Sequence, residues 1–242
     1  ISDGLPQNLW ASSIQASNHS VSRVYAALNG YRWDHFTSYV YLSDDYGKTW
    51  QRIGLDLPTE PVNIIKEDPV NPDILYVGTD QGLYISIDRG THFMTLGDLP
   101  YVAVHDLAIQ ARDKEIVAAT HGRSLYKADI SHVEKVNMEM VDSLTCFNEK
   151  ISIFYRERWG SRSASWTEYA QPSVSFPVYT GSAGQARLQV YADSLMVSDQ
   201  EIKLEKGLSY YTYNLEMNES STEPLKNLMI QRKPDTNPQI KK

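Results

Sequence analysis

The chain has 242 residues, of which 41% are hydrophobic and 22% charged, and its formal net charge is −7. This length predicts one or two domains, and the acidic balance argues against nucleic acid as a partner, because phosphate binding needs a basic surface. No apolar run is as long as the roughly 18 residues of a membrane-spanning helix, so we expect no membrane span. The single cysteine, Cys146, permits no internal disulfide and fits no metal-ligand pattern. We therefore expect neither a metal nor a cofactor.

The first part of the chain, residues 1–130, reads as short strands arranged in three similar copies. Each copy begins with a Leu-Pro pair, at 5–6, 57–58 or 99–100, and continues with an alternating segment and two further apolar runs. Alternation, β-branched and aromatic residues, and the Asn, Asp, Pro or Gly breakers between runs all favour strands. Three or four short strands in about 40 residues are typical of one blade of a β-propeller.

The first copy is longer than the others, and the extra residues fit the stretch 30–39. Loops that interrupt a regular scaffold often carry binding residues. Within this stretch Tyr31 or Trp33 can stack on a sugar, while Arg32 and Asp34 can hydrogen bond to a sugar or a protein partner. These four residues are candidate ligand-binding residues. The alternative, a loop that packs its aromatic rings against a neighbouring blade, stays equally open.

An eight-residue phrase of the form S-x-D-x-G-x-(T/H)-(W/F) occurs twice, at 43–50 and 86–93. Its aspartate can accept backbone N–H groups and close a turn, its glycine permits a positive φ, and its aromatic residue restarts a strand. Nothing in the phrase demands catalysis. We expect turn-forming roles for Ser43, Asp45, Gly47, Thr49 and Trp50 in the first phrase, and for Ser86, Asp88, Gly90 and Phe93 in the second.

The third copy ends near residue 130 without such a phrase, and it contains a second candidate site. His105 and Asp106, and His121 and Arg123, lie at strand ends of this copy that can face the same axis. A His, an Asp and an Arg can bind a carboxylate or act in general acid–base chemistry. The sequence favours a structural alternative, in which His105 and Asp106 fix a strand and Arg123 pairs with a carboxylate. Two histidines without a third ligand make a poor zinc site.

The pattern changes at about residue 131, and the repeated phrase does not recur before residue 242. Strand-like segments are predicted at 150–157, 172–180, 186–193 and 208–217. We interpret residues 131–242 as a β-sandwich-like module that ends in an exposed polar tail at 231–242.

The runs YVYLSDDYGKTWQRI and LYISIDRGTHFMTL resemble the BNR or Asp-box repeats of sialidases, family-74-type glycosidases, sortilin-like domains and many secreted bacterial proteins. The resemblance covers residues 1–130. It implies a propeller whose Asp boxes lie at the periphery of the blades, and a secreted, periplasmic or outer-surface bacterial protein. The arginine cluster and Tyr–Glu pair of sialidases have no match here, nor do the two aspartates of family 74. No catalytic residue is therefore transferred to this chain.

The predicted fold class is all-β, with β-propeller blades that carry Asp-box hairpins, followed by the small antiparallel sandwich. Three copies are fewer than the roughly four to eight blades of a propeller, so we expect further propeller blades of a longer parent protein. The main hypothesis is a non-catalytic segment that binds a glycan, a protein or a peptide. The alternative is part of a glycoside hydrolase, sialidase-like or family-74-like, whose catalytic residues lie outside this chain. A peptide-binding propeller is a third hypothesis.

Overall fold

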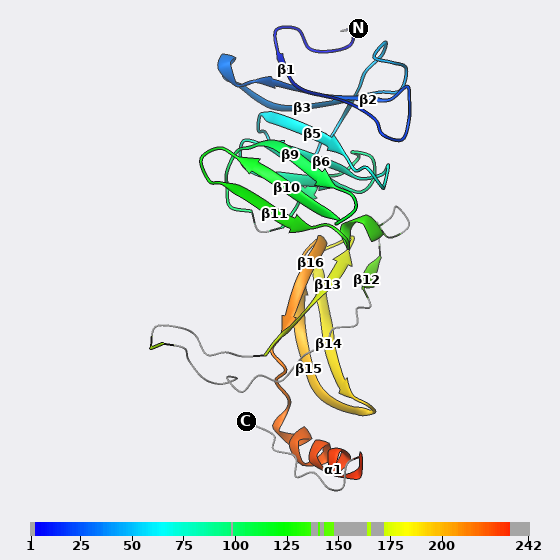
Figure 1. Cartoon of the computed structure of the whole chain (residues 1–242), viewed down its shortest axis with the longest axis vertical. Coiled ribbons are helices and arrows are strands. Elements are labelled where there is room, and N and C mark those ends of the chain that lie inside the picture. Colours follow the sequence, from blue (N-terminus) through cyan, green and yellow to red (C-terminus); the bar gives the residue numbers. More distant parts are fainter. Residues whose placement is uncertain are drawn as a thin grey trace. The chain divides into compact units, whose positions relative to one another are not determined.

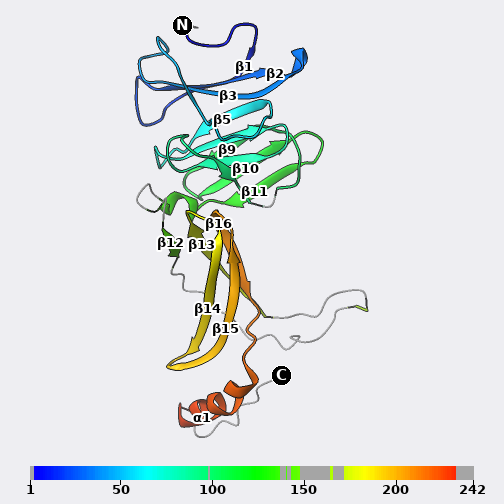
Figure 2. The same cartoon turned by 180° about the vertical axis from the view of Figure 1, so that it is seen from behind.

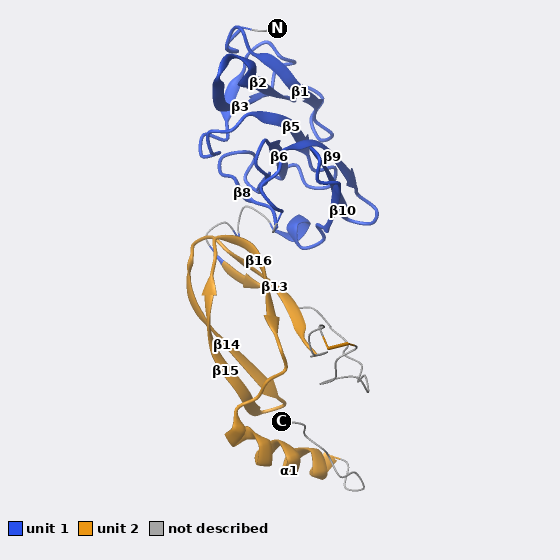
Figure 3. Ribbon diagram, turned by 90° about the vertical axis from the view of Figure 1, so that its left-hand side faces the viewer, with its two compact units in different colours: residues 1–143 blue, residues 144–242 orange. Residues whose placement is uncertain are grey.

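The computed structural model describes residues 3–97, 99–136, 140, 143–147, 164–165 and 172–232. The chain divides into two compact units, unit 1 (residues 1–143) and unit 2 (residues 144–242), which Figure 3 colours separately. Apart from one α-helix and short 3-10 turns, the regular elements described are strands. The predicted all-β class is confirmed. The predicted domain boundary after residue 130 stays a prediction, and each unit is described by itself.

Unit 1 contains three antiparallel sheets, in each of which every strand pairs with the next one in sequence. We call these sheets blades 1, 2 and 3, and Figures 1 and 2 show them stacked on one another. Blade 1 consists of β1 (Trp10–Ala16), β2 (Val24–Gly30), β3 (His35–Ser43) and β4 (Gln51–Ile53). Blade 2 consists of β5 (Val62–Glu67), β6 (Leu75–Thr79), β7 (Leu83–Ser86) and β8 (Met94–Thr95), and blade 3 of β9 (Val104–Gln110), β10 (Glu115–Thr120) and β11 (Leu125–Asp129).

Blade 2 is the middle layer, and its strand β6 is buried at every residue. Leu75 and Val77 join a core cluster with Tyr25 and Ala27 of blade 1. Tyr76 lies between them in sequence, so its side chain points to the other face of the sheet, where it is also fully buried. A sheet covered on both faces needs a continuous apolar run rather than alternation, and LYV at 75–77 is such a run.

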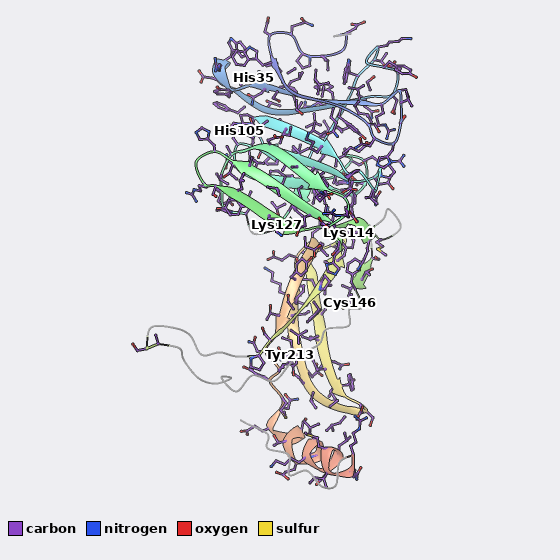
Figure 4. The ribbon with its side chains drawn as sticks, viewed as in Figure 1. His35, His105, Lys114, Lys127, Cys146 and Tyr213 are labelled. Carbon is purple, nitrogen blue, oxygen red and sulfur yellow. The ribbon has the colours of Figure 1, made fainter. Side chains whose placement is uncertain are left out.

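The register places three hairpins at one end of unit 1, which we call the hairpin end. In each blade the start of the first strand pairs with the end of the second strand. The turn from the second strand into the third therefore lies beside the start of the first strand. The register pairs that show this are Trp10 with Asn29, Val62 with Thr79, and Val104 with Thr120. His35, which begins β3, and His105, the second residue of β9, lie on the same side of unit 1 in Figure 4.

After β11 the chain forms a 3-10 turn, Val133–Lys135, in place of a third Asp box. Ile130, Val133 and Val136 are buried, and the Asn71 side chain donates a hydrogen bond to the Val136 carbonyl at 3.4 Å. The residues that follow the third copy therefore complete the packing of unit 1.

Unit 2 contains a three-stranded sheet, a two-stranded sheet and a helix. The strands predicted at 172–180, 186–193 and 208–217 overlap three that are present, although the last one ends at Tyr213. The predicted strand at 150–157 and the tail from 233 lie outside the described residues. The sheets are formed by β12 (Leu144–Cys146), β13 (Val174–Thr180) and β16 (Gly207–Tyr213), and by β14 (Gly184–Ala192) and β15 (Leu195–Leu204).

Three elements of unit 2 had no counterpart in the sequence interpretation, namely β12, β15 and the helix α1 (Thr222–Arg232). The tail was expected to begin at Gln231, but α1 includes its first two residues. Pro224 lies in the first helical turn, where its missing N–H costs nothing, and Lys226 pairs with Glu223 at 2.6 Å. At the other end Arg232 pairs with Asp193 at 2.7 Å.

Candidate functional site

The first Asp box closes its turn through a compact hydrogen-bond network. The Ser43 hydroxyl donates to Asp45 Oδ1 at 2.8 Å and accepts the Gly47 N–H at 2.9 Å. Asp45 also accepts the N–H groups of Lys48 and Thr49, and the Thr49 hydroxyl at 2.7 Å. The pKa of Asp45 is lowered to about 2, because the Thr49 N–H, the Thr49 hydroxyl and the Ser43 hydroxyl stabilise the ionised carboxylate.

The second Asp box repeats this network in a more buried place. Ser86 donates to Asp88 Oδ1 at 2.8 Å and accepts the Gly90 N–H at 2.7 Å. His92 donates its N–H at 2.9 Å, and its ring lies 2.7 Å from the other carboxylate oxygen. Burial by itself raises the pKa of Asp88, but the hydrogen bonds from His92 and Ser86 outweigh it and lower the pKa overall.

The aromatic residue that ends each box packs into the core. Trp50 packs against the cluster of Ala26, Leu28 and Tyr41, and Phe93 packs against the cluster shared by blades 1 and 2. The boxes connect β3 to β4 and β7 to β8, so they lie at the opposite end of unit 1 from the hairpins. Their aspartates are occupied in turn closure, and the boxes form no part of the candidate site.

The candidate site is built around exposed aromatic rings at the hairpin end of blade 1. The Trp10 and Trp33 rings meet edge to face, with centroids 5.4 Å apart and an interplanar angle of 89°. The Arg32 guanidinium lies 4.3 Å from the centroid of the Trp10 ring and 5.7 Å from that of Tyr31, and it donates to the Tyr31 hydroxyl at 3.0 Å. Trp10, Tyr31 and Trp33 are 47%, 46% and 52% exposed. We call Trp10, Tyr31, Arg32 and Trp33 the aromatic cluster.

Trp10 is the member of the aromatic cluster that sequence reasoning missed. It lies 21 residues before Tyr31, and the β1–β2 register brings it to the hairpin by pairing it with Asn29. The available signal was its position at the start of an alternating segment that precedes the inserted loop. Asp34, the remaining candidate of this loop, adopts a left-handed conformation with φ 54° and donates its N–H to the Tyr31 carbonyl. It therefore ends the short 3-10 turn Tyr31–Trp33.

A chain of side-chain amides holds this loop against blade 2. Asn29 accepts the Tyr31 N–H at 3.0 Å and donates to Asn63 Oδ1 at 3.1 Å. Asn63 in turn donates to Asp80 Oδ1 in the β6–β7 hairpin at 2.9 Å. Hydrogen bonds of this kind fix the backbone of the loop and limit the rotation of the aromatic cluster with respect to blade 2. The sequence interpretation singled out none of these three polar residues.

The second candidate cluster lies at the hairpin end of blade 3. The His105 and His121 rings are 5.5 Å apart between centroids and are tilted by 58°. Asp106 accepts the N–H of Leu107 at 2.8 Å. Arg123 lies two residues after His121 in the exposed β10–β11 hairpin. The structure therefore brings the two histidines together, although they are 16 residues apart in sequence.

Among the described residues, no group of three or more His, Cys, Asp or Glu side chains is arranged to hold a metal ion. The described helix is also too short and too polar to cross a membrane. Cys146 in β12 is exposed and free. Within the residues that the structure describes, the two clusters at the hairpin end are therefore the candidate sites.

Neither the family models nor the curated proteins contain a match to this chain. Similar solved structures include the GH74 xyloglucanase from Xanthomonas campestris (18% identity, TM-score 0.41, 49% of this chain and 22% of that one). They also include the GH74 enzyme of Niastella koreensis (14%, 0.41, 49% and 21%) and an ancestral GH74 enzyme (18%, 0.39, 81% and 18%). This chain spans less than a quarter of the length of each. At these values the likeness assigns no activity to it.

Proposed function

We propose that unit 1 is a carbohydrate-binding segment of a β-propeller and that the aromatic cluster is its sugar platform. The observation that carries the proposal is the set of three half-exposed aromatic rings held beside a guanidinium. Apolar faces of sugar rings stack on aromatic side chains, and Arg32 and Asp34 supply hydrogen-bonding groups for hydroxyls around the stacked ring.

The packing of the aromatic cluster supports the same proposal. About half of each of the three rings is accessible to solvent, so the blades of this chain leave them open to a ligand. The edge-to-face contact with Trp10 and the amide chain from Asn29 restrict the loop before any ligand arrives. Restriction of this kind lowers the ordering cost of binding.

Binding is tested by isothermal titration calorimetry of the whole chain with a panel of soluble polysaccharides. The panel includes xyloglucan, the substrate named for one of the similar structures. We expect Trp33→Ala to weaken binding by about tenfold, which corresponds to roughly 1–1.5 kcal/mol for a lost aromatic contact. Tyr191→Ala in β14 is the matched control, because Tyr191 is 53% exposed but lies in unit 2. Equal affinities of Trp33→Ala and the unsubstituted chain would contradict the proposal.

A second candidate is that the segment belongs to the propeller of a glycoside hydrolase. Hydrolysis of a glycosidic bond needs two carboxylic groups that flank the bond. Each blade places one aspartate at or next to its hairpin, but Asp80 is bonded to Asn63, and Asp106 to a backbone N–H. The catalytic pair would then come from blades outside this chain. A reducing-sugar assay on the chain alone is expected to show no cleavage of a polysaccharide that the chain binds in the calorimetric titration, and cleavage would contradict this candidate.

A further inference from the structure

Blades 2 and 3 build their hairpin ends on the same backbone plan. Asp80 donates its N–H to the Pro61 carbonyl at 3.2 Å, and His121 donates its N–H to the Ala103 carbonyl at 2.9 Å. The residue before each donor is a threonine whose N–H and hydroxyl both bond to a carbonyl further along the hairpin. Asp80 and His121 therefore occupy equivalent positions in the two blades.

The first strands of the two blades, β5 and β9, also match at the hairpin end. In β5 the register shifts between Val62 and Ile64, which leaves Asn63 as the bulged residue. In β9 a corresponding shift leaves His105 as the bulged residue. Bulges of this kind change the direction of a side chain. Asn63 and His105 are thus equivalent, and each lies beside the equivalent hairpin residue of its own blade.

The two blades differ in what this pair of positions does. In blade 2, Asn63 donates to Asp80 at 2.9 Å and accepts from Asn29 of blade 1 at 3.1 Å. In blade 3 the same positions hold two exposed imidazoles in ring contact. A hydrogen-bonded pair of a donor and an acceptor in blade 2 is replaced in blade 3 by two imidazoles, with Arg123 in the same hairpin.

We propose that His105, His121 and Arg123 form a binding site for an anionic group of a glycan, a carboxylate or a sulfate. Imidazolium and guanidinium groups donate strong charge-assisted hydrogen bonds to such anions. The site lies on the same end of unit 1 as the aromatic cluster, so it extends the proposed function from neutral sugars to acidic ones. The inference rests on the proposed function only in taking the ligand to be a glycan.

The charged groups around the pair are Arg123 and two aspartates. Asp106 on β9 is exposed, although one of its oxygens accepts the Leu107 N–H, and Asp80 of the neighbouring hairpin is bonded to Asn63. Arg123 therefore supplies the cationic group of the site, and the imidazole N–H groups of the two histidines supply further hydrogen-bond donors.

The test follows the imidazole C–H resonances of the whole chain by NMR during titration with glucuronate, a sulfated monosaccharide, glucose and inorganic phosphate. We expect glucuronate or the sulfated sugar to shift the resonances of His105 and His121. Binding of the charged sugar should be about tenfold tighter than binding of glucose, the size expected for charge-assisted bonds. Resonances of His92, at the opposite end of unit 1, serve as the internal control.

Two substitutions complete the test. Arg123→Gln should weaken the binding of the charged sugar, whereas Arg112→Gln, which removes another exposed arginine, should not. Absence of shifts at His105 and His121 would overturn the inference, and phosphate binding as tight as that of the sugars would overturn the glycan assignment. Because the titration uses monosaccharides and reads the histidines directly, its failure is distinguishable from a failure of Trp33→Ala to change polysaccharide binding.

Discussion

Blade 2 contacts its two neighbours in different ways. Towards blade 1 it presents Glu67, whose buried carboxylate accepts hydrogen bonds from the Ser17 hydroxyl, the Asn18 N–H and the Tyr25 hydroxyl at 2.7–2.9 Å. Towards blade 3 it presents Gly78, where an added Cβ would lie only 2.8 Å from Val104 Cγ1. The interface with blade 1 therefore adds a fully hydrogen-bonded buried charge to its apolar core, whereas the interface with blade 3 depends on close approach of the backbone at Gly78.

The difference shows that a repeated sheet does not specify repeated interfaces. Burial of the phenol raises the pKa of Tyr25, and the adjacent Glu67 carboxylate raises it further, because both oppose formation of the phenolate. A buried carboxylate is tolerated only when its oxygens are well supplied with donors, and three residues of blade 1 provide them. No donor of this kind is needed at Gly78, where the contact is made by van der Waals packing alone.

The largest expected effect comes from the interface with blade 1. Glu67→Ala leaves the Tyr25 and Ser17 hydroxyls and the Asn18 N–H without their acceptor, so we expect a loss of about 3–4 kcal/mol in the free energy of unfolding. Glu67→Gln keeps one acceptor oxygen and should lose about half as much. Urea denaturation measures both variants. A Glu67→Ala chain as stable as the parent would show that the hydrogen bonds to the Glu67 carboxylate contribute nothing to stability.

The interface with blade 3 should respond to a single methyl group. In Gly78→Ala the new Cβ would lie 2.6 Å from Ile64 Cγ2 and 2.9 Å from the Val104 carbonyl oxygen. We expect a loss of about 2–3 kcal/mol, because the two blades must separate slightly or strain. Gly82→Ala is the control, since its nearest neighbour, Tyr84 Cε2, is 3.8 Å away. Similar stabilities of the two variants would mean that the blades adjust freely.

The smallest effect is expected at the first Asp box, which belongs to neither interface. The pKa of Asp45 is about 2 in the folded chain, below its ordinary value of 3.8. Its contribution to stability is therefore present above about pH 4 and is lost as the pH falls towards 2. NMR titration of the Asp45 carboxyl carbon checks the pKa, and Asp45→Asn should remove this part of the acid response. An Asp45 pKa near 4 would contradict the assigned hydrogen bonds.

The Asp boxes were predictable because the hydrogen bonds from their serine and aspartate side chains that close the turns join residues within four positions of one another. The same holds for the strands of unit 1, whose alternation and breakers are local. The elements of unit 2 were harder to predict from the sequence. Strand β15 mixes polar and apolar residues without a clear period, and α1 has no buried residue that would give its sequence an apolar stripe. Elements with little burial leave little pattern to find.

The candidate site was only partly predictable, for a related reason. Tyr31, Arg32, Trp33 and Asp34 could be found together because they are consecutive, and His105 and His121 because both lie at strand ends. The roles of Trp10, Asn29 and Asn63 could not be predicted from the sequence, since an isolated tryptophan or asparagine is compatible with many roles.

Local hydrogen bonding and side-chain alternation were thus sufficient to specify the turns, the strands and the all-β class. The fold alone decided which strand ends meet, which ring joins the aromatic cluster and which residues bond across the blades. Glu67 and Ser17 are 50 residues apart, as are Ser12 and Val62, whose side-chain hydroxyl and carbonyl bond at 2.7 Å. Contacts of this kind depend on register and stacking, which arise from the sum of many weak packing terms rather than from any one residue.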